Sequence, residues 1–110
     1  PCGDYVLKQT AELLTEFAPE NSKTGRLGGD EFLVLTAVRE DESHISKYAE
    51  MIVRNVQRIW WNGEDIHASI SIGYAVTEPG WSYEKLYKCA DEALYTAKKN
   101  GKNRVWRYQK

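Results

Sequence analysis

The sequence predicts an α+β fold in which helices flank a mostly antiparallel sheet. Three segments repeat apolar residues at helical spacing, and two pairs of extended segments meet at glycine-containing turns. A last extended segment follows the third helical one. In chain order the predicted elements are helix, two strands, helix, two strands, helix and strand. The length of 110 residues suits one compact domain.

Each predicted helix carries an apolar stripe along one side. The first spans about 4–17, the second about 42–58 and the third about 83–99. The second has the cleanest stripe, made of Ile45, Tyr48, Ala49, Ile52, Val53, Val56 and Ile59. Ser82 is placed to cap the start of the third helix, and Gly101 follows its end.

Two predicted hairpins and a final strand supply the sheet. The predicted strands span 24–27, 31–36, 60–61, 64–76 and 103–108. Gly28-Gly29 is the expected turn of the first hairpin and Asn62-Gly63 that of the second. In the long strand the residues of one face, Ser71 and Gly73 among them, are small enough to permit close packing.

Composition excludes several functional classes. The formal net charge of −1 does not attract the whole molecule to nucleic acid or to an acidic membrane. No apolar run is long enough to span a bilayer and no signal peptide opens the chain. We therefore expect a cytoplasmic domain, which could belong to a membrane-anchored parent protein.

Cys2 and Cys89 are expected to be free thiols in a reducing compartment. The pair Trp60-Trp61 is expected to pack rather than to bind.

The stretch with the clearest chemistry is the first hairpin turn. It carries two adjacent carboxylates, Asp30 and Glu31, directly after Gly28-Gly29. Glycines let phosphates approach the backbone, and carboxylate oxygens could hold Mg²⁺ for a triphosphate. On these residues alone, a surface turn with solvated acids is the alternative.

The run from Arg26 to Phe32 (RLGGDEF) resembles the signature of GGDEF domains, the catalytic module of diguanylate cyclases. Three further blocks agree in order: Gly3-Asp4, the Ser71-Ile72-Gly73 strand, and the run 90–98 (ADEALYTAK) followed by Gly101-Lys102-Asn103. The resemblance covers essentially the whole chain. It implies a fold similar to the palm of nucleotidyl cyclases, which is ferredoxin-like.

The resemblance also implies an activity. In this family, two protomers each hold one GTP, and the 3′-hydroxyl of one attacks the α-phosphate of the other. Pyrophosphate leaves, and the reverse attack closes cyclic di-GMP, a bacterial second messenger. Such enzymes use Mg²⁺ or Mn²⁺, act as homodimers, and commonly follow an upstream sensor domain. The alternative is a GGDEF-like domain without catalysis that binds GTP as a sensor or serves as a partner platform.

Residue roles follow from the same match. Asp30 corresponds to the signature metal ligand, Glu31 to its neighbouring acid, and Gly28 and Gly29 to the turn against which substrate binds. Asp4 corresponds to a carboxylate that accepts the two parallel N–H donors of guanine. Its alternative role is to cap the first helix.

Two lysines correspond to phosphate contacts of the family. Lys98 matches a lysine of the motif, whereas Lys102 stands where the family usually has arginine. Lysine keeps the positive charge of arginine but lacks the paired N–H donors with which a guanidinium group binds a phosphate. The alternative for both is that cations stabilise the C-terminus of a helix.

Two features depart from the family pattern. The family's first strand, with a metal-binding aspartate, and a loop asparagine that holds guanine have no counterpart here. We therefore expect residues 1–110 to be roughly the C-terminal two-thirds of a GGDEF domain, inactive alone. The product-binding RxxD site of many members would fall at Pro19 and Ser22, so feedback through it should be lost.

Overall fold

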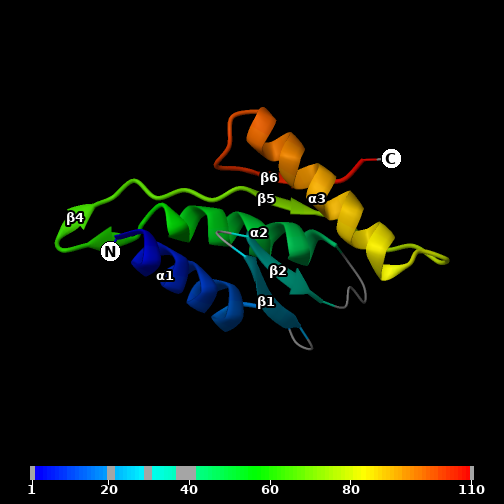
Figure 1. Ribbon diagram of the computed structural model, residues 1–110, viewed down its shortest axis with the longest axis horizontal. Coiled ribbons are helices and arrows are strands. Elements are labelled where there is room, and N and C mark those ends of the chain that lie inside the picture. The colour runs from blue at the N-terminus through cyan, green and yellow to red at the C-terminus, as the bar shows by residue number, and fades with distance from the viewer. Residues whose placement is uncertain (1, 20–21, 29–30, 37–41, 110) are drawn as a thin grey trace. The chain divides into compact units, whose positions relative to one another are not determined.

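The computed structural model describes residues 2–19, 22–28, 31–36 and 42–109 (Figure 1). The chain divides into two compact units, residues 1–68 and 69–110. The first contains α1 (Cys2–Glu16), β1 (Lys23–Gly28), β2 (Glu31–Leu35), α2 (Ser43–Val56), β3 (Trp60–Trp61) and β4 (Glu64–Asp65). The second contains β5 (Ile72–Tyr74), α3 (Tyr83–Lys99) and β6 (Val105–Arg107). The predicted α+β class is confirmed.

The core of the first unit lies along α2, which packs on α1. The buried side chains of α2 belong to the predicted apolar stripe: Ala49, Ile52, Val53 and Val56. From α1, Thr10 and Leu14 are buried. The hydroxyl of Tyr48 donates a hydrogen bond of 2.6 Å to the carbonyl of Leu14, and burial raises the pKa of Tyr48 to about 12. The two helices are thus joined by apolar packing and by the Tyr48 hydrogen bond.

β1 and β2 form the first predicted hairpin, and β1 extends to Gly28, a residue predicted to lie in the turn. Arg26 pairs with Phe32, but the next pair is Gly28 with Glu31, so β1 carries one extra residue as a bulge. The strands therefore close at Gly28–Glu31. The predicted turn residue Gly28 thus belongs to β1, and the other predicted turn residue, Gly29, lies outside the described residues.

The second predicted hairpin is confirmed, with its turn at Asn62-Gly63. Both residues have positive φ, 54° and 77°, as a two-residue turn between twisted strands requires. The turn joins β3 to β4, and Trp61 pairs with Glu64. The packing prediction is wrong for Trp60, whose side chain is 57% exposed.

The predicted long strand 64–76 is not continuous. β4 ends at Asp65 and β5 begins at Ile72. Between them His67 has a φ of 52°, and its backbone N–H donates to Asp65 Oδ1 at 2.9 Å. This local side-chain bond closes a small turn and interrupts the extended run.

In the second unit α3 packs against β5 and β6, which run parallel (Figure 1). A helix between two paired strands allows the parallel arrangement, which a short turn cannot. The prediction of mostly antiparallel pairing holds because the other two strand pairs of the described residues are antiparallel. The buried side chains of α3 are Cys89, Ala93 and Ala97, and Cys89 is a free thiol, as predicted.

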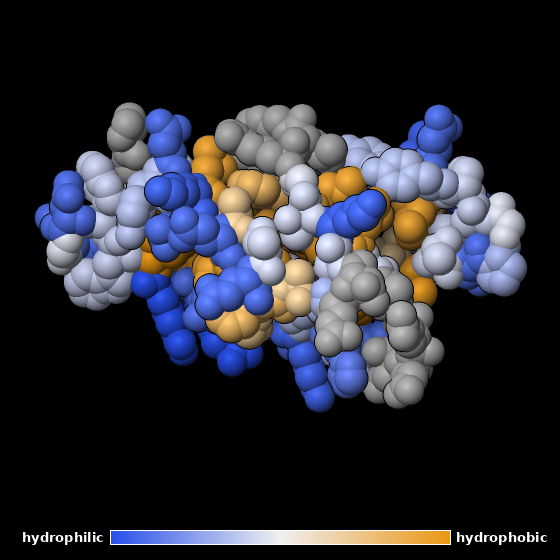
Figure 2. Space-filling view, turned by 90° about the horizontal axis from the view of Figure 1, so that it is seen from below, coloured by the Kyte–Doolittle hydropathy of each residue, from blue (hydrophilic) through white to orange (hydrophobic). Residues whose placement is uncertain are grey.

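Not every large apolar side chain is buried. Figure 2 shows hydrophobic atoms among hydrophilic ones on the face that it draws. The exposed large side chains include Phe17, Trp60, Tyr83 and Tyr95. Single exposed aromatics are common on protein surfaces, so none of them marks a site alone. No helix in the described ranges is long and apolar enough to cross a membrane.

Candidate functional site

Two signature residues that the structure describes, Gly28 and Glu31, lie at the end of the β1–β2 hairpin. Gly28 ends β1 and Glu31 begins β2, and these two residues form the closing pair. Gly29 and the predicted metal ligand Asp30 lie outside the described residues. Among the residues that the structure does describe, no three His, Cys, Asp or Glu side chains gather as a metal site.

Asp4 lies in the first turn of α1, and its side chain is exposed. The helix begins at Cys2, so Asp4 is already helical and is not the residue that precedes the helix. Asp4 is therefore not the N-cap residue of α1, and the capping alternative is wrong. A carboxylate in the first turn still interacts favourably with the helix dipole, and its exposure leaves it able to meet a ligand.

Lys98 and Lys102 lie together at the C-terminal end of α3, and both are exposed. The helix ends in a Schellman motif: the N–H of Lys102 donates to Ala97 O at 3.0 Å, and that of Gly101 to Lys98 O at 3.4 Å. Gly101 has a φ of 118°, which explains the glycine. The predicted end of the third helix is confirmed, and the sharp reversal keeps both lysines at one helix end.

The structure thus groups the predicted residues in two sets. Asp4, Gly28 and Glu31 belong to the first unit, and Lys98 and Lys102 to the second. Sequence reasoning missed a contact within the second unit. Ser71 Oγ accepts a hydrogen bond of 3.0 Å from the backbone N–H of Asn103. Both residues belong to blocks that carry the family resemblance, which is the signal that could have paired them.

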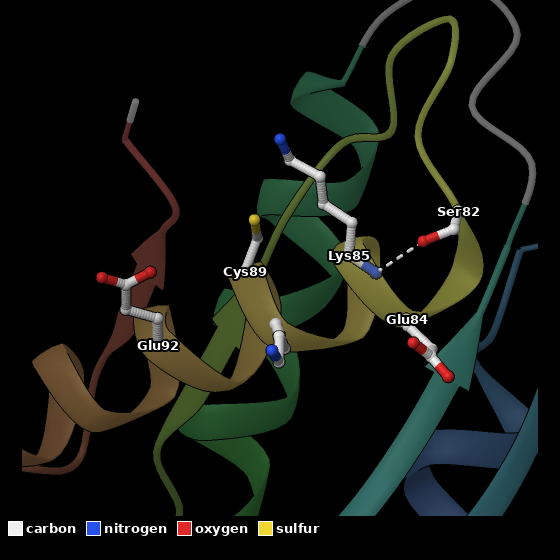
Figure 3. A pocket seen from close by; sticks show the side chains of 6 residues that line it. Ser82, Glu84, Lys85, Cys89 and Glu92 are labelled. Atoms are coloured by element: carbon white, nitrogen blue, oxygen red, sulfur yellow. Dashed lines mark hydrogen bonds between the residues drawn. The ribbon is translucent and has the colours of Figure 1, made fainter.

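A shallow depression of about 430 Å³ lies along the N-terminal half of α3 (Figure 3). Its lining comprises Ser82, Glu84, Lys85, Lys88, Cys89 and Glu92. Two acids and two lysines leave no net charge that would select one kind of ion. Ser82 is already occupied as the helix cap, since its Oγ accepts from Lys85 N at 3.1 Å. None of the predicted site residues lines this depression.

An aromatic cluster joins the start of α3 to the segment after β6. The rings of Trp81 and Tyr108 meet edge to face at 6.3 Å, and Lys85 Nζ lies 5.1 Å from the Trp81 ring centre. A hydrogen bond with Cys89 raises the pKa of Tyr108, and the nearby Glu92 charge contributes to the same shift. The cluster fixes the C-terminal segment against α3.

Comparison with known proteins decides the family. Residues 1–104 match the sequence family described as "Diguanylate cyclase, GGDEF domain". The chain belongs to the GGDEF family. This GGDEF chain is 40% identical over 107 residues to diguanylate cyclase DosC of Escherichia coli, and 37% identical over 98 residues to diguanylate cyclase DgcN of the same species. These matches cover 94% and 87% of the chain, but only 23% and 24% of the relatives.

A solved relative agrees with the fold. The GGDEF domain of DgcB from Caulobacter crescentus, solved in complex with c-di-GMP, superposes with a TM-score of 0.88 at 31% identity. The superposition covers 99% of this chain and 64% of that structure. The predicted nucleotidyl-cyclase type of fold is therefore confirmed.

Product feedback should be absent at the position where many GGDEF domains have their RxxD site. Here that position holds Pro19 and Ser22, which provide neither a guanidinium fork nor a carboxylate. The Ser22 hydroxyl oxygen is moreover buried. Titrating cyclic di-GMP into the full-length protein should show no inhibition that depends on these residues. A tight complex whose contacts map to Pro19 and Ser22 would contradict the prediction.

Proposed function

We propose that this GGDEF chain is part of a diguanylate cyclase that condenses two GTP molecules into cyclic di-GMP and releases pyrophosphate, for bacterial second-messenger signalling. The observation that carries the proposal is the unbroken signature from Gly28 to Phe32 at the tip of a hairpin closed by the Gly28–Glu31 pair. A domain that only binds a partner does not need both acids. The relatives named as diguanylate cyclases support the same activity.

In this proposal Asp30 and Glu31 hold Mg²⁺ or Mn²⁺. Their donor set fits, since adjacent carboxylates offer the hard oxygen ligands that such ions prefer. When bound, such an ion would neutralise phosphate charge and favour deprotonation of the attacking 3′-hydroxyl. Gly28 and Gly29 leave the backbone of the tip open to a phosphate.

The remaining residues bind GTP. Lys98 and Lys102 supply positive charge to the phosphates from one end of α3, and both are exposed to do so. Asp4 accepts the N1–H and N2–H donors of guanine. Because the reaction joins two nucleotides, a homodimer brings two such sites together, and a domain elsewhere in the protein supplies the signal. All of residues 1–110 belong to this one catalytic domain.

The direct test is synthesis by the full-length protein. With GTP and Mg²⁺ it should release cyclic di-GMP and two pyrophosphates for each product. Binding of GTP with no product over many hours would favour the alternative function, a GTP sensor or partner platform.

Changing Asp4 to asparagine should weaken GTP binding and leave the fold intact. The substitution replaces one acceptor by a donor, so one guanine N–H faces a donor, which costs about 1–3 kcal/mol. GTP affinity should then fall about tenfold or more, as calorimetry would measure. The matched control is Glu12→Gln, which removes one exposed acidic charge from the same helix. A loss of stability with GTP affinity retained would show that Asp4 serves only the helix.

A further inference from the structure

Three consecutive residues after α3 have left-handed backbone conformations. Gly101, Lys102 and Asn103 have φ values of 118°, 60° and 51°. Glycine adopts this region freely and asparagine tolerates it, but lysine has no such preference. Strained backbone of this kind persists only where its surroundings hold it, and it is often found at functional sites. We call residues 101–103 the lysine turn.

Bonds from three sides hold the lysine turn. The N–H of Lys102 is tied to Ala97 O of α3 at 3.0 Å. Arg104 Nε donates to the carbonyl of Lys102 at 3.1 Å. The N–H of Asn103 donates to Ser71 Oγ at 3.0 Å. The main chain of Lys102 is thus restrained on both sides of its own Cα, and the following residue is anchored as well.

Ser71 differs from the other partners in its origin. Ala97 and Arg104 are close to the turn in sequence, whereas Ser71 precedes its partner Asn103 by 32 positions. It stands directly before β5, where the parallel ladder begins with Ile72 N donating to Arg104 O at 2.9 Å. The Ser71 hydroxyl therefore fixes the position of the lysine turn relative to the β5–β6 strand pair and not only relative to the end of α3.

We infer that Ser71 is a positioning residue for GTP binding, which acts by holding the lysine turn so that Lys102 meets the phosphates. The inference rests on the proposed function, because it takes Lys102 as a phosphate ligand. Ser71 carries no charge and its hydroxyl oxygen is engaged by Asn103, so it acts through the backbone and not by contact with substrate. The lysine side chain is a flexible four-carbon stem, so fixing its main chain narrows the range of positions that its ammonium group can reach.

The test uses the full-length protein and three variants at this place. Ser71→Ala removes the acceptor and should raise the KM and the Kd for GTP about fivefold, the effect of losing one hydrogen bond, with kcat nearly unchanged. Ser71→Thr keeps the hydroxyl and should restore both values. Ser69→Ala, an exposed serine two positions earlier, is the matched control and should leave them unchanged.

A double-mutant cycle separates the inference from the proposed function. Lys102→Met should weaken GTP binding, and adding Ser71→Ala to it should cost nothing more, because Ser71 acts through Lys102. If Lys102→Met leaves GTP binding unchanged, the phosphate role in the proposed function fails. If Lys102→Met weakens binding but Ser71→Ala does not, or if the two effects add, the inference is overturned while the proposed function stands.

Hydrogen exchange gives a readout that needs neither GTP nor activity. In Ser71→Ala the amide of Asn103 should exchange faster, while amides within α3 should keep their protection. Unchanged exchange at Asn103 would overturn the inference. Loss of protection throughout α3 would also overturn it, because Ser71 would then serve general stability.

Discussion

Replacing Asp30 with alanine in the full-length protein should abolish cyclic di-GMP synthesis and leave the melting temperature nearly unchanged. In the sequence Asp30 stands between Gly28 and Glu31, the closing pair of the β1–β2 hairpin, and the apolar run 32–35 anchors β2 without it. In the proposed function the substitution would remove a metal ligand and leave the attacking hydroxyl less well activated. We expect kcat to fall by about a hundredfold or more. Product assays at saturating GTP and Mg²⁺ measure the effect.

The control for Asp30 comes from the other hairpin. Glu64 is an exposed acid that begins β4 directly after the Asn62-Gly63 turn. Glu64→Ala should keep full activity. Mg²⁺-dependent GTP binding should weaken in Asp30→Ala more than metal-free binding does. If Asp30→Ala keeps near-wild-type synthesis, the catalytic role of this turn is wrong, and the binding-module function becomes the better one.

Replacing Gly73 with alanine should strongly destabilise the second unit. A Cβ on Gly73 would lie 2.5 Å from Leu94 Cα and 2.6 Å from the carbonyl carbon of Ala93. These are backbone atoms of α3 and cannot move aside as a side chain can. We expect a loss of about 3 kcal/mol, or about 10 °C in melting temperature. Thermal melting and loss of amide protection in α3 measure it.

Gly25 supplies the matched control for this substitution. It also lies in a strand, but a Cβ added there would meet nothing within 4 Å. Gly25→Ala should change the melting temperature by no more than about 2 °C. If Gly73→Ala proves equally harmless, the close approach of β5 to α3 does not hold in solution.

Predictions that depend on neighbouring residues were accurate. The third helix was predicted at 83–99 and is observed at Tyr83–Lys99. Its start is set by the Ser82 cap and its end by Gly101, both of which act within a few residues. The Asn62-Gly63 turn was also correct, because the positive φ that it needs is a property of those two residues.

Predictions that depend on distant residues were less accurate. Alternating apolar residues predicted one strand over 64–76. Such alternation shows which residues would share a face of a strand, but it does not show whether a partner strand is present. His67 turns the chain, and pairing resumes only at Ile72. The extension of β1 to Gly28, a predicted turn residue, has a similar origin, because a bulge is defined by the partner strand.

The same division between local and distant effects applies to the candidate site. The signature run, Asp4 and the two lysines could be identified as residue types in order along the chain, because a family motif is a property of the sequence. The bond between Ser71 and Asn103 and the contact of Gly73 with the α3 backbone depend on the parallel pairing of β5 and β6 around α3. Pairing across more than 30 residues is decided by the packing of the whole unit, so only the tertiary structure could reveal it.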